Sequence, residues 1–415
     1  MNAAPGSGPG SQDQAINVVI GANSLSGPLT GIGHYTINLI EGLSQISEID
    51  EIRLLSHGCL SQPLQEGTSA PAISNMEDSH RQPPITGRSL LGALRVKAAG
   101  NRLIVNLYDA AISRVSAWSL RGFGSTDIFH SPDFQYATFP GKTVVTIPDL
   151  STMTYPEFHP ASRVGYINRH IRRAVSHADH IVAISDFVRG EIISRLKVEK
   201  ERVTTIYPGV EPGFAPITEQ AFVEARPISE LRFNNYFLFV STIEPRKNIS
   251  RLLEAYERYI EAEGETRLPL VVVGFPGWNS SAVHHELQRL ARCGHVMYPG
   301  YVSRDALRTL LAGARALLFP SLYEGFGLPV AEAMRSATAV LTSQDSAMAE
   351  ISGGAALLVD PLDIEGLVNG ISRLHHDEAL LEKMVESGLI IGNRYSWERC
   401  ARETLDLYRF LQVKS

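Results

Sequence analysis

The run Tyr-Glu-Gly-Phe-Gly-Leu-Pro-Val-Ala-Glu-Ala-Met, residues 323–334, places two glutamates around two glycines. Directly upstream, the segment Arg-Ala-Leu-Leu-Phe-Pro-Ser at 315–321, with its apolar centre, predicts a buried strand that ends in a turn. Pro329 suits the first turn of a helix, where its missing N–H costs nothing. The run therefore predicts a strand, a glycine loop and a helix. Backbone N–H groups of such a loop, together with the positive end of the helix dipole, can face an anion.

The two glutamates, Glu324 and Glu332, indicate which kind of anion this would be. An ionised carboxylate only accepts hydrogen bonds, so it suits hydroxyl groups rather than a phosphate. A diphosphate with a sugar on one side and a ribose on the other would satisfy both the loop and the carboxylates. The alternative is that Glu332 only stabilises the N-terminus of a helix, as acidic residues often do. We favour a nucleotide-sugar site.

Short apolar runs alternate with amphipathic stretches along most of the chain, which indicates mostly parallel sheets covered on both faces. The fold class is therefore α/β, with two doubly wound, Rossmann-like domains that bind ligands at the carboxyl ends of their strands. We expect strands at 16–20, 52–55, 127–130, 143–147, 181–184, 203–206, 236–240, 270–273, 317–319, 339–341 and 356–359. We expect helices at 33–43, 163–178, 249–261, 284–292 and 329–335.

The length of 415 residues favours two domains. Residues 211–231 carry three prolines without a clear period, which is typical of an interdomain linker. The predicted organisation is a disordered tail, a first Rossmann-like domain, a linker, a second domain that carries the 323–334 run, and a terminal amphipathic helix. Their ranges are 1–14, 15–212, 213–230, 231–396 and 397–415.

The composition is that of a soluble globular enzyme, with 44% hydrophobic and 20% charged residues. The net charge of −6 gives no reason to expect nucleic-acid binding. Cys59, Cys293 and Cys400 lack metal-site spacing and are odd in number, which favours reduced thiols in the cytoplasm. The N-terminus has no signal-peptide pattern, and no apolar run approaches the ~20 residues that span a bilayer. We expect a cytoplasmic protein whose membrane contact, if any, is peripheral.

The run 323–334 resembles the paired-glutamate motif of the family 4 retaining glycosyltransferases, which share the GT-B fold. Three other segments resemble further parts of that family: its basic segment, its serine-containing loop and the end of its first domain. They are Val-Ser-Thr-Ile-Glu-Pro-Arg-Lys-Asn (240–248), Ala-Ile-Ser-Asp-Phe (183–187) and Thr-Thr-Ile-Tyr-Pro-Gly-Val (204–210). The resemblance runs from about residue 16 to the C-terminus. It is greatest to bacterial mannosyl- and rhamnosyltransferases of surface polysaccharide (O-antigen-type) assembly.

The resemblance implies two domains facing a cleft, the first (15–212) on the acceptor side and the second (231–396) binding the nucleotide-sugar donor. It also implies that the helix at 397–415 returns to the first domain. It further implies transfer of a hexose, with retention, from a nucleotide-diphosphate sugar to a lipid-linked glycan. The resemblance to mannosyl- and rhamnosyltransferases favours transfer of mannose, or of a deoxymannose such as rhamnose, from a GDP-sugar. One alternative is a transferase with a soluble sugar or glucan acceptor and a UDP- or ADP-sugar donor. Another is a catalytically silent protein that binds a nucleotide sugar.

Arg246 and Lys247 are the cations expected at the diphosphate. An arginine can bind it in a bidentate manner and a lysine acts as a compact charge. Negative charge grows on the leaving β-phosphate during transfer, so cations placed there stabilise the transition state more than the ground state. A solvated basic pair is the alternative, but the positive end of the following helix would disfavour it. With Glu324, these residues form the predicted catalytic set.

Other donor contacts follow from the resemblance. Gly31 and Gly33, in the loop after the first strand, would bind the phosphates through backbone N–H groups, although a tight structural turn fits the sequence equally well. Read as a dinucleotide fingerprint this loop fails at Thr36, so a dehydrogenase is not expected. The remaining expected donor-binding residues are Thr242, Gly300, Tyr301, Val302, Gly325, Phe326, Gly327, Leu328 and Glu332.

The chain departs from the family at Pro148. Family members commonly have His-Asp-Leu where this chain has Pro-Asp-Leu, and that histidine faces the transferred sugar. His130 and Asp149 are therefore the candidate sugar or acceptor contacts. A lone histidine is more often structural, and Asp149 could equally cap a turn. A front-side retaining mechanism needs no protein nucleophile, so the departure is compatible with activity.

We expect no metal and no other cofactor. The sequence has no Asp-x-Asp loop to hold a divalent ion, and Arg246 with Lys247 can supply the charge. The adjacent His284 and His285 would point to different faces of a helix, which makes them a poor metal pair.

The segment 88–121 is basic and amphipathic within an acidic protein. The segment contains six Arg or Lys residues and a single acidic residue, Asp109, and leucines are interleaved with the basic residues. This pattern suits the surface of an anionic membrane, where a lipid-linked glycan would be met. A solvated helix face packed on its own domain is an equal alternative.

Overall fold

The computed structural model describes residues 16–25, 31–64, 114–225, 228–278 and 280–413. The predicted tail at 1–14 and most of the basic segment, residues 88–113, lie outside the described residues. The chain divides into two compact units, which are described separately. The first comprises Met1–Pro132, Ala137–Val144 and Leu405–Ser415, and the second comprises Asp133–Tyr136 and Val145–Thr404.

The first unit is organised around strand β1, which is buried along most of its length. A continuous apolar run of this kind is typical of a central parallel strand. β1 pairs in parallel with β2 and β4, and β3 pairs antiparallel with β2. Its elements are β1 (Ile16–Gly21), η1 (Asn23–Leu25), α1 (Gly31–Ser44), β2 (Ile49–Ser56), β3 (Cys59–Leu60), β4 (Ile128–Ser131), the start of β5 (Lys142–Ile147) and the end of α16 (Trp397–Val413).

The second unit begins with the rest of β5 and the parallel pair of β6 (His180–Ala183) and β7 (Val203–Thr205). The strand order of the first sheet is β3-β2-β1-β4-β5-β6-β7. The connecting elements are α5 (Ser151–Thr154), η2 (Pro156–Phe158), α6 (Ala161–His177), α7 (Asp186–Leu196) and η3 (Lys200–Arg202).

The second sheet has the order β10-β9-β8-β11-β12-β13, with every pair parallel. Its strands are β8 (Phe237–Val240), β9 (Leu270–Val273), β10 (Val296–Gly300), β11 (Ala316–Phe319), β12 (Ala339–Ser343) and β13 (Leu357–Val359). Its helices are η4 (Pro245–Lys247), α9 (Ile249–Glu263), η5 (Gly264–Thr266), α10 (Ser281–Arg292), α11 (Arg304–Ala312), α12 (Leu328–Arg335), α13 (Ala347–Ser352), α14 (Ile364–His376) and α15 (Glu378–Gly392).

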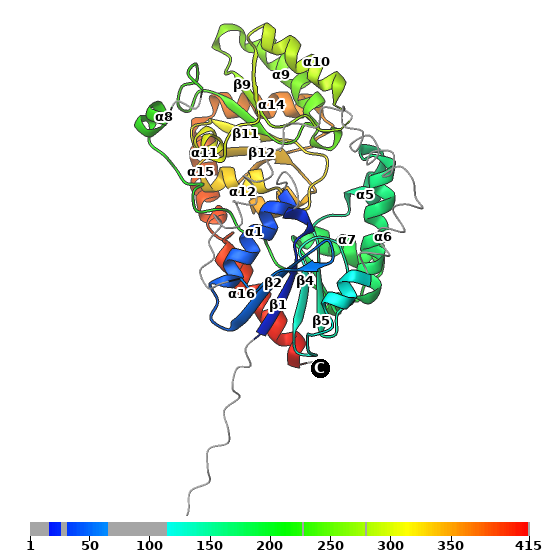
Figure 1. Cartoon of the computed structure of the whole chain (residues 1–415). Helices are drawn as coiled ribbons and strands as arrows, with labels where there is room; N and C mark the ends of the chain where they lie inside the picture. The colour runs from blue at the N-terminus through cyan, green and yellow to red at the C-terminus, as the bar shows by residue number, and fades with distance from the viewer. Residues whose placement is uncertain (1–15, 26–30, 65–113, 226–227, 279, 414–415) are drawn as a thin grey trace, which may run out of the picture. The chain divides into compact units, whose positions relative to one another are not determined.

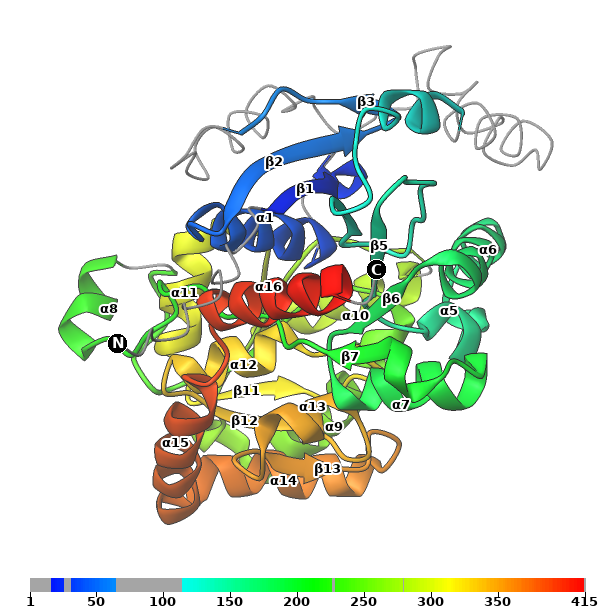
Figure 2. The same cartoon turned by 90° about the horizontal axis from the view of Figure 1, so that it is seen from below.

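The order of this second sheet reverses between β8 and β11. From β8 the chain builds outward through β9 and β10, and then returns to place β11 on the other side of β8. Figures 1 and 2 show the helices on both sides of the sheet, with α14 packed on α9 and α12 packed on α15. The carboxyl ends of the two strands at such a switch point are where open α/β sheets bind ligands.

The expected α/β class with two parallel-sheet, Rossmann-like domains is confirmed. Several elements were not predicted, among them β10, α7, α14 and α15. Within the predicted linker the chain forms a short helix, α8 (Glu219–Ala225), whose Phe222 is buried against Tyr236. Among the described residues, no helix combines the length and the apolarity needed to cross a bilayer.

Candidate active site

Two loops meet at the switch point of the second sheet. The loop after β8 leads through Thr242 and η4 to α9, and the loop after β11 leads to α12. Asn248 joins them at the start of α9, in the left-handed conformation with φ of 61°. Its Nδ2 donates hydrogen bonds to the carbonyls of Pro320 at 3.0 Å and Pro361 at 2.7 Å. The backbone N–H of Leu322 donates to the carbonyl of Arg246 at 2.9 Å. The two loops are therefore held in one fixed arrangement.

Arg246, Lys247 and Glu324, the three predicted catalytic residues, lie together where these loops meet. Arg246 Nη1 donates to Glu324 Oε2 at 3.0 Å, and Lys247 Nζ donates to the other carboxylate oxygen. Arg246 Nη2 donates to Glu244 Oε1 at 2.6 Å, and its Nη1 also donates to the carbonyl of Tyr323 at 2.6 Å. Two carboxylates and two cations thus form one buried group, which we call the ion cluster: Glu244, Arg246, Lys247 and Glu324.

The electrostatics of the ion cluster keep Glu324 ionised. Burial alone would raise the pKa of Glu324, but the charges and hydrogen bonds of Arg246 and Lys247 outweigh it and hold the pKa at about 2. Burial, and then the charge of Arg246, lowers the pKa of Lys247, although Glu324 and Glu244 oppose the shift. The cluster as a whole is formally neutral when both cations are protonated.

Glu332 belongs to a different network. Its carboxylate, in α12, accepts from Arg304 Nη2 at 2.9 Å, and Arg304 also donates to Glu211 at 2.9 Å. Burial raises the pKa of Glu332, the charge of Arg304 opposes this, and the charge of Glu211 adds to it. Glu332 is the fifth residue of α12, beyond the first turn in which an acidic residue gains from the helix dipole. The two glutamates of the motif therefore have separate partners.

The glycines of the 323–334 run permit close packing. A Cβ on Gly325 would lie 1.9 Å from the carbonyl oxygen of Pro148, so only glycine fits there. Ser185 Oγ donates to the carbonyl of Gly325 at 2.6 Å. Gly327 immediately precedes α12 with φ of 96°, a left-handed conformation that favours glycine. Phe326 is buried and packs edge-on against Tyr395, so only its backbone is placed for a ligand contact.

Asp149 packs against the loop that carries Glu324, since its Cβ lies 3.1 Å from the position that a Cβ on Gly325 would take. From there its charge raises the pKa of Arg246. Its Oδ1 accepts from the backbone N–H of Ser151 at 2.8 Å, which fixes the start of α5. The next residue, Leu150, donates its N–H to the Tyr323 hydroxyl at 3.0 Å, and that hydroxyl also contacts Glu191. The Pro148–Leu150 segment is thereby tied to the loop that carries Glu324.

The predicted residues of the first unit have structural partners. His130 is fully buried at the end of β4, and its Nδ1 lies 2.6 Å from the Tyr408 hydroxyl. Burial lowers the pKa of His130 to about 3, so the ring is neutral at physiological pH. Gly31 and Gly33 were expected in a loop, but they are the first and third residues of α1. The first four N–H groups of a helix have no intrahelical partner, so these can still bind an anion.

Three of the predicted donor-binding residues, Gly300, Tyr301 and Val302, lie at the end of β10 and directly after it. Gly300 ends the strand with φ of 78°, and its carbonyl accepts from the N–H of Gly274 at 2.9 Å. Tyr301 is exposed and stacks on Phe275, with ring centroids 4.3 Å apart. Val302 is half-buried, and Thr242, after β8, is exposed.

Sequence reasoning missed several residues of the site: Glu244, Tyr323, Arg304, Glu211 and His159. Glu244 lies inside the basic segment that was singled out, and its position two residues before Arg246 was the available signal. His159 is a buried histidine after η2, with its ring centroid 5.8 Å from that of Trp278. Nothing in its sequence position linked it to the segments around Arg246 and Glu324.

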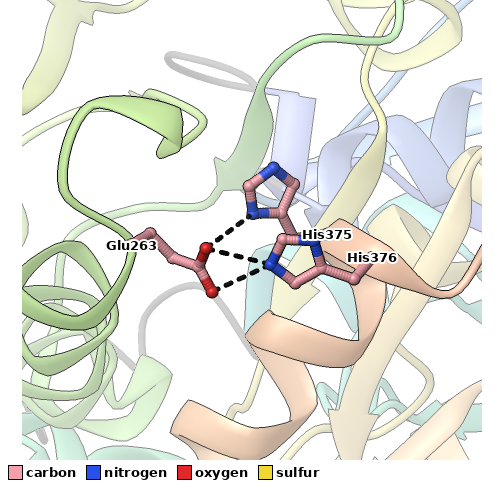
Figure 3. Close-up of side chains that lie close together, drawn as sticks. All are labelled: Glu263, His375 and His376. Carbon is pink, nitrogen blue, oxygen red and sulfur yellow. Dashed lines mark hydrogen bonds and ion pairs between the residues drawn. The ribbon is translucent and has the colours of Figure 1, made fainter.

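Figure 3 shows a further group that contains metal-ligating residues, at the ends of α9 and α14: Glu263, His375 and His376. His376 Nε2 lies 2.9 Å from each carboxylate oxygen of Glu263. His375 Nδ1 lies 2.9 Å from the Tyr259 hydroxyl, which itself accepts from the N–H of Leu268. The hydroxyl proton is therefore directed to Nδ1, the nitrogen that a metal would need. We interpret the group as a hydrogen-bonded link between two helix ends.

The chain matches two glycosyltransferase families along its length. Residues 30–214 match the family described as Glycosyltransferase Family 4, and residues 225–389 match the family described as Glycosyl transferases group 1. The two matches together span both sheets.

Full-length relatives give the same assignment. O-antigen chain mannosyltransferase B of Escherichia coli is 31% identical over 396 residues, covering 95% of this chain and 100% of the relative. Serotype-specific mannosyltransferase WbdA of Escherichia coli is 27% identical and covers 91% of this chain, which spans only 45% of that longer protein. Among solved structures, Anabaena Alr3699/HepE in complex with UDP and glucose has a TM-score of 0.66 at 16% identity, covering 94% of this chain and 99% of that one. This last likeness shows the fold alone.

Proposed function

Because this chain belongs to the family 4 glycosyltransferases, we propose that it is a retaining, metal-independent hexosyltransferase of polysaccharide assembly. The donor is a nucleotide-diphosphate sugar, GDP-mannose or a GDP-deoxymannose such as GDP-rhamnose. The acceptor is a lipid-linked glycan at the cytoplasmic face of the membrane. The mannosyltransferase relatives support the sugar and the type of product.

The observation that carries the proposal is the ion cluster at the switch point. Arg246 is anchored by Glu244 and by the Tyr323 carbonyl, so its guanidinium is fixed before any ligand binds. Lys247 has a different role, because Glu324 is the only carboxylate among the described residues that forms an ion pair with its ammonium. An incoming diphosphate can therefore draw Lys247 away from Glu324 without dismantling the anchor of Arg246.

Glu324 then becomes available to the sugar. It stays ionised, since its pKa is about 2, and an ionised carboxylate beside a phosphate would be repelled. Its oxygens can instead accept hydrogen bonds from sugar hydroxyls. When Lys247 exchanges Glu324 for the diphosphate, the roles of the three residues separate. Arg246 and Lys247 then bind the diphosphate, and Glu324 orients the hexose.

The reaction needs no protein nucleophile. The bond between the anomeric carbon and the β-phosphate oxygen breaks while the acceptor oxygen bonds to the same face of the sugar. The acceptor proton passes to the departing phosphate oxygen. Arg246 and Lys247 stabilise the negative charge that develops there, and a fixed donor at such a position contributes roughly 10²–10³-fold to the rate.

The test is a transfer assay with GDP-mannose, GDP-rhamnose, UDP-glucose and ADP-glucose, in which the anomeric configuration of the product is read by NMR. We expect activity with a GDP-sugar and retained configuration. Lys247→Ala should lower transfer by at least about 10²-fold with an unchanged circular dichroism spectrum. Lys383→Ala, at an exposed position of α15, is the matched control. Activity only with a UDP- or ADP-sugar would overturn the donor assignment, and an inverted product would overturn retention.

A further inference from the structure

His159 belongs to a segment that packs on the loop carrying Glu324: the ring of the preceding Phe158 stacks on Tyr155, and Tyr155 in turn contacts the ring of Tyr323. His159 follows η2 directly, and its backbone N–H donates to the carbonyl of Pro156 at 3.1 Å. Trp278 Nε1 donates to the carbonyl of the preceding Phe158, and the rings of His159 and Trp278 are in contact. Only 8% of His159 is exposed. Its backbone and its ring are therefore both fixed by neighbours.

Neither ring nitrogen of His159 has a hydrogen-bond partner among the described residues, and both nitrogens are buried from solvent. Leaving a buried polar group without a partner is destabilising, because its hydrogen bonds to water are lost and not replaced. Other buried histidines of this chain are paired: Nε2 of His180 lies 2.8 Å from Thr204 Oγ1, and Nδ1 of His130 lies 2.6 Å from Tyr408. A purely structural role would favour such a partner. Buried ring nitrogens without a partner also occur on His284 and His295, but these two residues are only half-buried. Among the described histidines that are buried as whole residues, His159 differs from His130 and His180 in having neither ring nitrogen paired.

The surroundings of His159 indicate which chemistry would satisfy it. Burial, and then the charges of Arg246 and Arg163, lower the pKa of His159, while Asp149 and Glu244 raise it; the net direction is downward. The ring is therefore neutral at physiological pH, with one N–H donor and one bare nitrogen acceptor. Phosphate oxygens only accept hydrogen bonds, whereas a sugar hydroxyl both donates and accepts. A hydroxyl is the ligand group that matches a neutral imidazole.

Arg246 supplies an independent observation at the same place. Its Nε is also buried and has no partner among the described residues, although both of its terminal nitrogens are engaged. An arginine Nε only donates, so it suits an acceptor such as a diphosphate oxygen. Arg246 therefore offers only a hydrogen-bond donor, whereas the His159 ring offers both a donor and an acceptor. This difference matches a phosphate at Arg246 and a sugar hydroxyl at His159.

We propose that His159 binds the hexose of the donor through a hydrogen bond to one of its hydroxyls, which makes it a residue that selects and positions the transferred sugar. This inference rests on the proposed glycosyltransferase function. It assigns the sugar end of the donor to His159 and the diphosphate end to Arg246 and Lys247.

The test separates the sugar from the nucleotide. The full chain is titrated in a calorimeter with GDP and with GDP-mannose, or with the nucleoside diphosphate and nucleotide sugar that the transfer assay selects. We expect His159→Ala to weaken binding of the nucleotide sugar by about 3- to 10-fold and to leave the nucleoside diphosphate unchanged. His159→Gln, which keeps one donor and one acceptor group, should recover part of the loss. His285→Ala, at an exposed position of α10, is the control and should change neither affinity.

Two results would overturn the assignment. Equal weakening of both ligands would place His159 at the diphosphate or in a structural role, and unchanged binding of the nucleotide sugar would remove it from the site. The comparison is internal to each variant, so partial misfolding, which affects both ligands alike, cannot imitate the expected result. Failure of the proposed function is distinct, since the wild-type protein would then transfer no sugar from any nucleotide sugar.

Discussion

Glu324→Gln is the most informative single change, because it removes one charge from the ion cluster and keeps the shape of the side chain. Glu324 has only 11% of its side chain exposed and is the acceptor for both Arg246 and Lys247. In the variant, Arg246 keeps Glu244 and the Tyr323 carbonyl. Lys247 loses its carboxylate and remains buried, and an uncompensated buried charge is strongly destabilising.

The magnitude follows from the pKa of Glu324, which is lowered from 4.5 to about 2. Each pKa unit corresponds to about 1.4 kcal/mol, so the interaction is worth roughly 3 kcal/mol of the free energy of unfolding at pH 7. Because the folded-state pKa is depressed, this stability is present above the unfolded pKa of 4.5 and is lost as the pH falls toward 2. By pH 3, about 2 kcal/mol of it should be gone.

The assay is urea unfolding of the wild type and of Glu324→Gln at several pH values between 7 and 3. We expect the variant to be less stable by roughly 3 kcal/mol at pH 7, and the difference to shrink by about 2 kcal/mol at pH 3. Glu254→Gln breaks an exposed ion pair with Arg258 and should cost less than about 1 kcal/mol at neutral pH. A wild-type advantage that stayed constant over this range would refute the reasoning, since it would show that Glu324 gains nothing from its charge.

Two further predictions concern the loop and the metal. Gly325→Ala should lower the thermal midpoint and transfer together, because the new Cβ would lie 1.9 Å from the Pro148 carbonyl oxygen; Gly190→Ala in α7, where a Cβ meets nothing within 4 Å, is the control, and equal behaviour of the two would contradict the close packing. Transfer should persist after EDTA treatment and dialysis, because Arg246 and Lys247 supply the positive charge at the diphosphate. An absolute requirement for added Mn²⁺ or Mg²⁺ would reject the metal-independent mechanism.

The sequence predicted those parts of the molecule whose signals are local. The strand, glycine loop and helix around Glu324 and Pro329 each follow from residue types within a dozen positions, and the structure contains β11, the loop and α12 there. Arg246 and Lys247 were singled out because a basic pair before a helix is electrostatically unfavourable without an anion. The alternation of strands and helices, which predicts the α/β class, is also a local signal, since each strand is a short apolar run bounded by turns.

What the sequence could not provide is pairing between distant segments. Arg304 joins Glu211 and Glu332, and the first of these pairs spans 93 residues. In the sequence alone, each of these residues would be taken for an ordinary charged residue on the surface. Only the fold brings them together as partners. β10 was missed for a different, local reason: its Val-Met-Tyr-Pro-Gly sequence contains a proline and ends in glycine, and both argue against a strand.

His159 shows how long-range information changes which residue is proposed for the sugar. Reasoning from the chain alone turned to His130, the histidine at the end of a predicted strand, to supply the imidazole that Pro148 lacks. The structure gives His130 a tyrosine partner in the first unit, at 2.6 Å from Tyr408, whereas His159 is a buried imidazole without a partner among the described residues. Which histidine has hydrogen-bonding capacity to offer a ligand depends on the partners of each, and those partners lie far away in sequence. Sequence position does not distinguish His130 from His159 as a ligand-binding residue. The hydrogen-bond partners of each ring, which only the structure shows, favour His159.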